Sequence, residues 1–383
     1  MENKPLPPHY QFYLTGRDPL ASGLPPKRPV IGVLTGNGIG PEVISAALRV
    51  AAAVTKVCGL DLELRYGGLI GEHAEAENLP TLPENVIQFC SEIFSAGGAV
   101  LNGPGGGRYV YDLRKEFDLF CKFVPVQPWP QLANAGKLVG SHLKDVNMLI
   151  VRDNIGGVYQ GEWSEAVGQE GRIAEHRFFY TESQIYRLVE IAARAAAHRR
   201  GRLHVIVKEG GVPGISALWR DVSLAVARKF SVKATIMNVD LAAYELIQHP
   251  QLFDVLVAPN LIGDIMADVA GVLVASRGLT FSGNFTPEGH GVYQTNHGCA
   301  HDLAGTDRAN PAGQILSMAM LLRESFGLDR AADLIERALA RCWTEGWRTE
   351  DIAEPGCSTL GTQAMGDRVV EQVFRLAEEQ LPA

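Results

Sequence analysis

Three aspartates, Asp240, Asp264 and Asp268, are the residues whose types and spacing point most directly to chemistry. Hard divalent cations bind several carboxylate oxygens, and a metal-bound hydroxy acid reacts when a base and an acid lie nearby. Asp264 and Asp268 are separated by one helical turn, so a helix in this segment would place both carboxylates on one face. Together the three residues indicate a divalent-metal site.

Each aspartate also has a simpler explanation. Asp264 could be a helix N-cap, Asp268 could favour a first helical turn, and Asp240 could cap a helix that starts at Leu241. Because aspartate is a common helix starter, capping is the more frequent role for any one of them. Only the combination of all three favours a metal.

A lysine, a tyrosine and an arginine complete this chemistry. Lys208 lies in a strand-like stretch, and Arg152 and Tyr159 lie in an earlier run. They could serve as base, anion contact and acid. Taken singly, a strand-end lysine and a surface ion pair are the more ordinary explanations for Lys208 and Arg152, and a packing role is as ordinary as a catalytic one for Tyr159.

A glycine-rich loop, Gly36-Asn37-Gly38-Ile39-Gly40-Pro41-Glu42, follows the first apolar run. Its glycines allow the backbone to approach a ligand closely, and Pro41 and Glu42 suit the first turn of a helix. The spacing is not G-x-G-x-x-G, so a nucleotide site of Rossmann type is not supported. A plain strand-to-helix turn remains an alternative.

Length and composition restrict the class of protein. A chain of 383 residues is long enough for two domains, and a net charge of -8 argues against a nucleic-acid partner. The six cysteines contain no Cys-x-x-Cys pair, so reduced cytoplasmic thiols are expected. We find neither a signal peptide nor a membrane span, and the proline-rich residues 1–29 are expected to form an extended arm.

Apolar runs alternate with helical patterns along the chain, which predicts an α/β fold with largely buried strands. Residues 160–177 are charged and could form a loop, a hairpin or an arm that reaches a partner subunit. The expected strands are 30–34, 99–101, 148–151, 204–207 and 253–258, and the expected helices are 44–54, 183–197, 312–326 and 330–343.

Taken in order, the motifs resemble those of the β-decarboxylating dehydrogenases, the isopropylmalate/isocitrate dehydrogenase family, and most closely the isopropylmalate branch. The likeness extends from about residue 30 to residue 380. It is carried by the loop at 36–42, Leu113 to Leu119, Val151-Arg152-Asp153, Gly156 to Gly161, Lys208, Val239-Asp240, Asn260 to Asp268, His297 to Gly305 and Ala309-Asn310-Pro311.

The resemblance implies a two-domain α/β subunit with a nucleotide site that is not of Rossmann type. Residues 30–119 and 274–383 would form the nucleotide-binding domain, and residues 120–273 the substrate and dimerisation domain. The active site would lie in the cleft between them.

The same resemblance implies roles for individual residues. Asp264 and Asp268, with Asp240 from the partner subunit, would hold Mg²⁺ or Mn²⁺. Lys208, also from the partner, would help to take the hydroxyl proton, and Tyr159 would protonate the enolate carbon. The implied assembly is a homodimer with shared active sites.

Arg114 and Arg152 match two arginines that bind the carboxylates of a malate, for which planar guanidinium forks are suited. Arg108 and Tyr111 lie in the preceding segment, which would select the side group at C3. The family's third arginine falls on Val124. Lys122 or Arg108 could compensate for it.

Eight residues match the family's cofactor site, and an aspartate there favours NAD over NADP because it would repel a 2′-phosphate. Asn37 replaces the usual aspartate of the glycine loop. The matching residues are Gly38, Ile39, His297, Gly298, Ala300, Asp302, Leu303 and Asn310.

We therefore expect NAD-dependent, Mg²⁺- or Mn²⁺-dependent oxidative decarboxylation of a 3-substituted malate. An isocitrate-, homoisocitrate- or tartrate-type dehydrogenase of a specialised pathway is an alternative. A weakly active regulatory subunit is another, motivated by Val124 and by Glu209-Gly210-Gly211 after Lys208.

Overall fold

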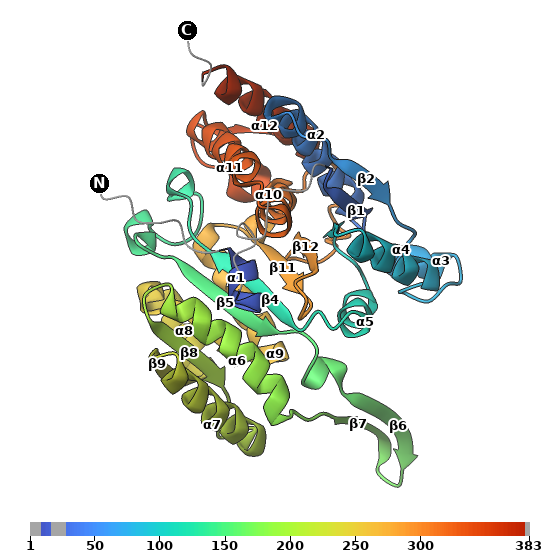
Figure 1. Cartoon of the computed structure of the whole chain (residues 1–383), viewed down its shortest axis with the longest axis vertical. Coiled ribbons are helices and arrows are strands. Elements are labelled where there is room, and N and C mark those ends of the chain that lie inside the picture. The colour runs from blue at the N-terminus through green and yellow to red at the C-terminus, as the bar shows by residue number, and fades with distance from the viewer. Residues whose placement is uncertain (1–8, 17–27, 380–383) are drawn as a thin grey trace.

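The computed structural model describes residues 9–16 and 28–379. A ten-stranded sheet runs through the molecule in the order β2-β1-β3-β12-β11-β4-β5-β10-β8-β9 (Figure 1). Its strands are β1 Val30–Leu34, β2 Glu63–Tyr66, β3 Ala99–Asn102, β4 Cys121–Val126, β5 Met148–Asp153, β8 Arg202–Val207, β9 Lys233–Asn238, β10 Val255–Ala258, β11 Phe281–Phe285 and β12 Gly291–Thr295.

The two outer parts of the sheet are parallel, and the centre is antiparallel. Strand β11 pairs antiparallel with β12 and β4, and β4 pairs antiparallel with β5, whereas the remaining pairs are parallel. All residues of β1, β3, β5, β10 and β12 are buried, and of these strands all but β12 were expected from continuous apolar runs. One sheet therefore connects both predicted domains, and the division between them stays a prediction.

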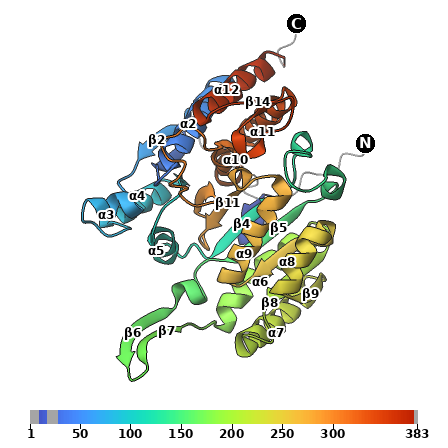
Figure 2. The ribbon, with the colours of Figure 1, turned by 180° about the vertical axis from the view of Figure 1, so that it is seen from behind.

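Helices cover both faces of the sheet (Figures 1 and 2). Helix α10 packs on β11 and β12 with α2, α11 and α12 around it, while α6 with α7 and α8 with α9 lie on opposite faces of the β5-β10-β8 region. The helices are α1 Tyr10–Thr15, α2 Gly40–Cys58, α3 Gly71–Ala76, α4 Glu84–Ser95, α5 Tyr109–Glu116, α6 Glu182–Ala197, α7 Pro213–Lys229, α8 Val239–Gln248, α9 Asn260–Ala270, α10 Ala312–Phe326, α11 Asp329–Thr344 and α12 Thr362–Glu378.

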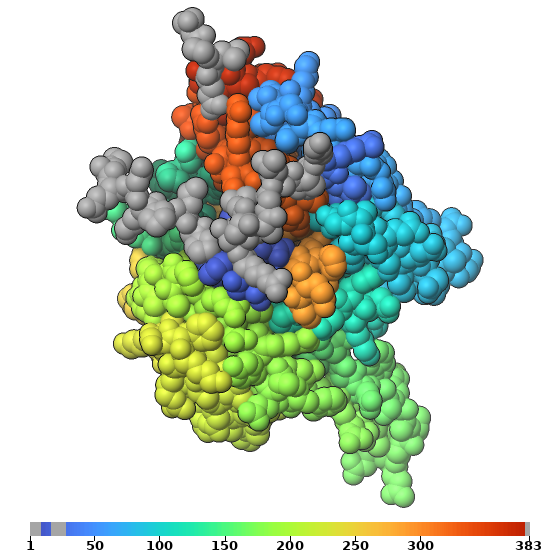
Figure 3. Space-filling view, in the orientation of Figure 1, coloured from blue at the N-terminus to red at the C-terminus, as the bar shows by residue number. Residues whose placement is uncertain are grey.

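The segment left open between loop, hairpin and arm is a hairpin. Strands β6 Glu162–Gly168 and β7 Gly171–Arg177 pair antiparallel and project away from the body of the molecule (Figures 1 and 3). Every residue of both strands is exposed except Gly168, which is half-buried. A two-stranded hairpin with no covered face is marginal by itself, which suggests that another surface completes it.

The extended conformation predicted for residues 1–29 is wrong at residues 10–15, which form α1. Tyr13 is buried, and the ring of Tyr10 stacks on Phe123 at 4.9 Å between centroids. These tertiary contacts, which local sequence does not reveal, hold the helical turns. Residues 1–8 and 17–27 lie outside the described residues.

The remaining elements are short. A two-stranded parallel pair is formed by β13 Trp347–Arg348 and β14 Ser358–Thr359.

In the part of the chain that the structure describes, we find no helix with the length and apolar character that crossing a bilayer requires.

Candidate active site

Asp264 and Asp268 lie on one face of α9, which follows β10 directly. The helix begins at Asn260, so the alternative of Asp264 as an N-cap is wrong, and Asp268 lies beyond the first turn. Asp264 accepts hydrogen bonds from Arg152 and from the Tyr159 hydroxyl, the latter at 2.9 Å. Asp268 accepts from Arg277 at 2.9 Å. Helical spacing thus places both carboxylates where β4 and β5 present their polar side chains.

Three buried cations face these carboxylates. Arg152 on β5 lies directly opposite Lys122 on β4, and Arg114 comes from α5. Their exposed fractions are 1%, 2% and 5% for Arg152, Lys122 and Arg114 respectively. Buried cations are costly unless an anion accompanies them, so this cluster points to an anionic ligand.

Arg152 is held rigidly. Its guanidinium donates to Asn260 Oδ1 at 3.2 and 2.9 Å as well as to Asp264. Asn260 is itself fixed, since its backbone N–H donates to the Tyr180 hydroxyl at 3.0 Å. Gly263 permits this packing, because a Cβ there would lie 2.8 Å from Arg152 Cγ.

Arg114 contrasts with Arg152. Within the described residues its guanidinium has no hydrogen bond and no ion pair, and it lies 5.8 Å from the ring centre of Tyr111. Burial and the neighbouring charge of Arg152 lower the pKa of Arg114 to about 9. A buried guanidinium without a partner is suited to binding a carboxylate in two-point fashion.

Electrostatics distinguish the two carboxylates. Burial opposes the ionisation of Asp264, yet the charges of Arg152 and Lys122 and the Tyr159 hydroxyl together lower its pKa. Burial raises the pKa of Asp268, and Asp264 adds to this although Arg277 opposes it. The charge of Asp264 therefore acts on Asp268, which means that the two carboxylates lie near each other.

The aromatic side of the site contains Tyr159, Tyr111 and Arg108. The rings of Tyr111 and Tyr159 lie 5.1 Å apart, and burial together with the charge of Asp264 raises the pKa of Tyr159. The Arg108 guanidinium lies 4.7 Å from the ring centre of Trp163 on the hairpin and 5.5 Å from that of Tyr111. Tyr159 thus stays protonated over a wide pH range and can donate a proton.

Lys208 and Asp240 form a pair of their own. Lys208 Nζ donates to Asp240 at 2.7 Å, and this lowers the pKa of Asp240. Asp240 is in the first turn of α8, whose N-cap is Asn238, so it is not the cap. Among the described residues of one chain, no three His, Cys, Asp or Glu side chains are grouped as metal ligands. Completion of the site by Asp240 of a second copy stays a prediction.

The glycine loop and the segment after β12 lie in contact, and their binding of one cofactor stays a prediction. The Ile39 backbone N–H donates to Cys299 O at 2.9 Å, and Ile39 packs with Ala300 and Leu303. Gly38 has a φ of 57°, and a Cβ there would lie 2.1 Å from Cys299 O, so this contact requires glycine. Four of the predicted cofactor residues are therefore adjacent.

The other four predicted cofactor residues have different surroundings. His297 Nδ1 contacts Gly298 O, whereas its Nε2 is buried and has no hydrogen-bond partner among the described residues. Asp302 is exposed. Asn310 is buried and donates to Asp351 at 3.1 Å. The orphaned nitrogen of His297 is suited to a polar ligand.

Asn37 has a function that sequence reasoning missed. Its Oδ1 accepts from the backbone N–H groups of Gly106 at 2.9 Å and Glu72 at 3.2 Å, and its Nδ2 donates to Ile70 O at 2.9 Å. An aspartate could not make the last bond. Asn37 thereby ties the glycine loop to the segment before Arg114. The signal in the sequence that could have revealed this role was an asparagine, which both donates and accepts hydrogen bonds, within the glycine loop.

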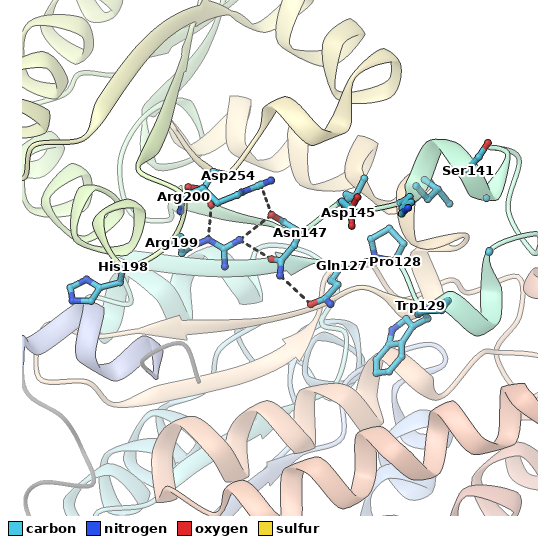
Figure 4. A pocket seen from close by; sticks show the side chains of 16 residues that line it. Gln127, Pro128, Trp129, Ser141, Asp145, Asn147, His198, Arg199, Arg200 and Asp254 are labelled. Carbon is cyan, nitrogen blue, oxygen red and sulfur yellow. Dashed lines mark hydrogen bonds and ion pairs between the residues drawn. The ribbon is translucent and has the colours of Figure 1, made fainter. Parts of the chain in front are cut away.

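A cavity of about 910 Å³ lies at the opposite ends of β4 and β5, near Gln127 and Asn147 (Figure 4). Its polar groups bind one another: Arg199 donates to Asp254 at 2.9 Å and to Asn147 Oδ1 at 2.7 Å. The buried charge of Asp254 in this cavity is therefore already paired within the protein.

Comparison with known proteins agrees with this geometry. Residues 30–369 match the family described as isocitrate/isopropylmalate dehydrogenase. The 3-isopropylmalate dehydrogenase of Aquifex aeolicus is 35% identical over 367 residues, covering 92% of this chain and 99% of that protein. The corresponding enzyme of Nitrosomonas europaea is 37% identical over 354 residues, covering 89% and 98%.

A solved structure is similar as well. The crystal structure of isocitrate dehydrogenase from Methylococcus capsulatus superimposes with a TM-score of 0.80 at 27% identity, covering 90% of this chain and 99% of that one. The chain therefore belongs to the isocitrate/isopropylmalate dehydrogenase family and is a β-decarboxylating dehydrogenase.

Proposed function

We propose that this protein catalyses NAD-dependent oxidative decarboxylation of a 3-substituted malate with Mg²⁺ or Mn²⁺. The observation that carries the proposal is Arg114, a buried guanidinium with no partner among the described residues, beside Arg152 and two carboxylates. A malate dianion would supply the missing negative charge, and the family membership supports the reaction type.

The donor set fits a hard divalent cation. Asp264 and Asp268 supply carboxylate oxygens from one helix face, and Asp240 of a second copy would add a third. When bound, the metal would act as a Lewis acid toward the substrate's hydroxyl oxygen. The chain's own residues would orient the substrate through Arg114 and Arg152.

Two side chains would move protons. Lys208, which is half-exposed and paired with Asp240, would take the hydroxyl proton in the active site of the neighbouring copy. Tyr159 keeps its proton because burial and Asp264 raise its pKa, so it can deliver that proton to carbon after CO₂ leaves.

The cofactor assignment rests on the adjacent loops of residues 36–42 and 297–303. The buried, unpartnered Nε2 of His297 and the close backbone contact at Gly38 support a bound nucleotide. The exposed carboxylate of Asp302 favours NAD, since it would accept from ribose hydroxyls and repel a 2′-phosphate. When bound, NAD⁺ would accept the hydride.

The test is NADH formation by the purified chain with Mg²⁺ and a panel of substrates: isopropylmalate, isocitrate, homoisocitrate, tartrate, malate, and alkyl- and aryl-malates. Asp264→Asn is the metal-null control. We expect NADH from at least one 3-substituted malate, lost in the control and in EDTA. No NADH from any panel member contradicts the proposal.

We also propose a homodimer with shared active sites. Helices α8 and α9 expose Leu241, Tyr244 and Ile265 by 50%, 61% and 46%, and the hairpin exposes Trp163 by 59%. Large apolar side chains exposed to this extent are typical of an interface. With its six free cysteines, the chain fits the reducing cytoplasm.

Mixing two inactive variants tests whether the subunits share their active sites. Lys208→Ala and Asp264→Asn should each be inactive, but their heterodimer has one site free of both changes. Random reassociation makes half of the dimers mixed, so about a quarter of wild-type activity should return. No recovery in dimers proven to exchange subunits would rule out sharing.

A further inference from the structure

Lys122 is a buried ammonium in the middle of the sheet. It lies on β4 with 2% of its surface exposed, and it pairs across the strands with Arg152. Lysine is almost never this deeply buried unless an anion accompanies it. A negative group is therefore needed to balance the charge of Lys122.

No carboxylate among the described residues forms an ion pair with Lys122, although the charges of Asp264 and Asp268 act on it from nearby. Its one hydrogen bond goes to a neutral amide, with Nζ donating to Asn296 Oδ1 at 2.6 Å. An ammonium has three donors, and this bond uses one of them. The nearby carboxylates are occupied, since Asp264 pairs with Arg152 and Asp268 with Arg277.

Lys122 and Arg114 therefore form a pair of buried cations without counter-ions on one side of the site. Burial and the charges of Arg152 and Arg114 lower the pKa of Lys122, and the charges of Asp264 and Asp268 oppose this only in part. Two such groups side by side match a ligand that carries more than one carboxylate.

Two other positions, Val124 and Arg108, are excluded as buried contacts for a carboxylate by their surroundings. Val124 lies two residue pairs farther along β4, buried at 1% in the hydrophobic core, and carries no charge. Arg108 already lies between Trp163 and Tyr111, with Asp112 at 3.6 Å, and is partly exposed. Of these three residues, Lys122 is the one that is both charged and buried, and it has no ion pair within the described part of the chain.

We propose that Lys122 is a substrate-binding residue that contacts a carboxylate of the malate skeleton together with Arg114 and Arg152. The inference rests on the proposed function and adds to it how this chain compensates for Val124. A lysine binds as a point charge and not as a planar fork, so Lys122 contributes affinity while the two arginines orient the substrate.

The test is calorimetric binding of malate to the full chain with Mg²⁺ present and NAD absent, so that no turnover occurs. Lys122→Met keeps the length of the side chain and removes the charge. We expect its Kd for malate to rise about ten- to hundredfold. Lys115→Met, at an exposed position of α5, is the matched control and should bind as wild type does.

Lactate serves as a second probe because it lacks one carboxylate of malate. The preference for malate over lactate should fall about tenfold or more in Lys122→Met. A purely structural role would weaken both ligands alike and leave the preference unchanged, and that result would overturn the inference.

Asn296→Asp provides a variant that retains the lysine in case Lys122→Met does not fold. It places a carboxylate against Nζ, which gives Lys122 an internal counter-ion and should weaken malate binding about tenfold. Wild-type affinity for malate in Lys122→Met, or in Asn296→Asp if the first variant is unfolded, overturns the inference. Absence of NADH with the substrate panel would instead refute the proposed function.

Discussion

At the scale of single residues, the site is defined by which charges are paired and which are not. Arg152, Asp264 and Tyr159 form one bonded set, whereas Arg114 has no partner among the described residues. Pre-positioned charges of this kind bind a ligand without first breaking protein contacts. Substitutions that remove one polar atom should therefore separate binding from catalysis.

Tyr159→Phe removes the hydroxyl and keeps the ring that packs against Tyr111 at 5.1 Å. Because the acid is lost while the aromatic contact stays, we expect kcat to fall by about 10²- to 10⁴-fold with little change in thermal stability. Steady-state kinetics on the best panel substrate measure this. A kcat close to wild type would exclude Tyr159 as the acid.

Asn37→Asp tests the bond that ties the glycine loop to Ile70. The variant loses the donor to Ile70 O and buries a carboxylate at a fully buried position, so we expect a loss of about 1 to 3 kcal/mol in the free energy of unfolding. Urea denaturation measures it, and Asn85→Asp at an exposed position is the control. Equal midpoints for the two variants would contradict the assigned role.

At the scale of elements, α9 carries the carboxylates and also makes room for Arg152. Gly263 is in the interior of this helix, where glycine is ordinarily about 1 kcal/mol less favourable than alanine. The site tolerates that cost because any Cβ would collide with Arg152 Cγ at 2.8 Å. The requirement for glycine at position 263 therefore comes from packing against Arg152 and not from the helix itself.

Gly263→Ala should therefore displace Arg152 and weaken malate binding about tenfold, and the helix-propensity gain should be offset by the clash. Gly214→Ala in α7 is the matched control, since among the described residues no atom beyond its chain neighbours and its own helix backbone lies within 4 Å of the new Cβ. It should stabilise the protein by about 0.5 to 1 kcal/mol without affecting binding. Calorimetry and urea denaturation of both variants check the contrast.

At the scale of the whole molecule, α1 links two distant layers. The Tyr10 backbone N–H donates to Glu324 of α10 at 2.6 Å, and Arg194 of α6 donates to Tyr13 O. Glu324 is buried, and burial raises its pKa to about 8. The folded state thus keeps a proton that the unfolded chain releases near the ordinary value of 4.5.

The direction of the pH dependence of stability follows from proton binding at Glu324. Between about pH 4.5 and 8 the folded state binds more protons than the unfolded chain at Glu324, so stability decreases as pH rises through this range. Glu324→Gln keeps an oxygen that can accept from Tyr10 and removes the titration. The variant should be the more stable protein at pH 8, and its advantage should vanish toward pH 4.5.

Urea denaturation at several pH values measures the difference between the two proteins. Glu378→Gln at an exposed position is the control and should follow wild type at every pH. An advantage of Glu324→Gln that is independent of pH would show that Glu324 does not bind the proton.

Local sequence determined the parts of this protein that depend on spacing along the chain. The run 148–151 predicted β5, the pattern 312–326 predicted α10 with the same bounds, and the helical spacing of Asp264 and Asp268 placed both on one face of α9. Periodicity and apolar runs are local properties, so they can be read without the fold.

Only the tertiary structure decided which of the charged residues meet. Lys122 faces Arg152 because of the register between β4 and β5, and within a buried strand the sequence pattern does not reveal that register. Residues 10–15 became a helix through contacts with α10 and α6 that lie hundreds of positions away in the chain. Charge pairing and burial are properties of neighbours in space, which is why the unmatched cations became visible only in the fold.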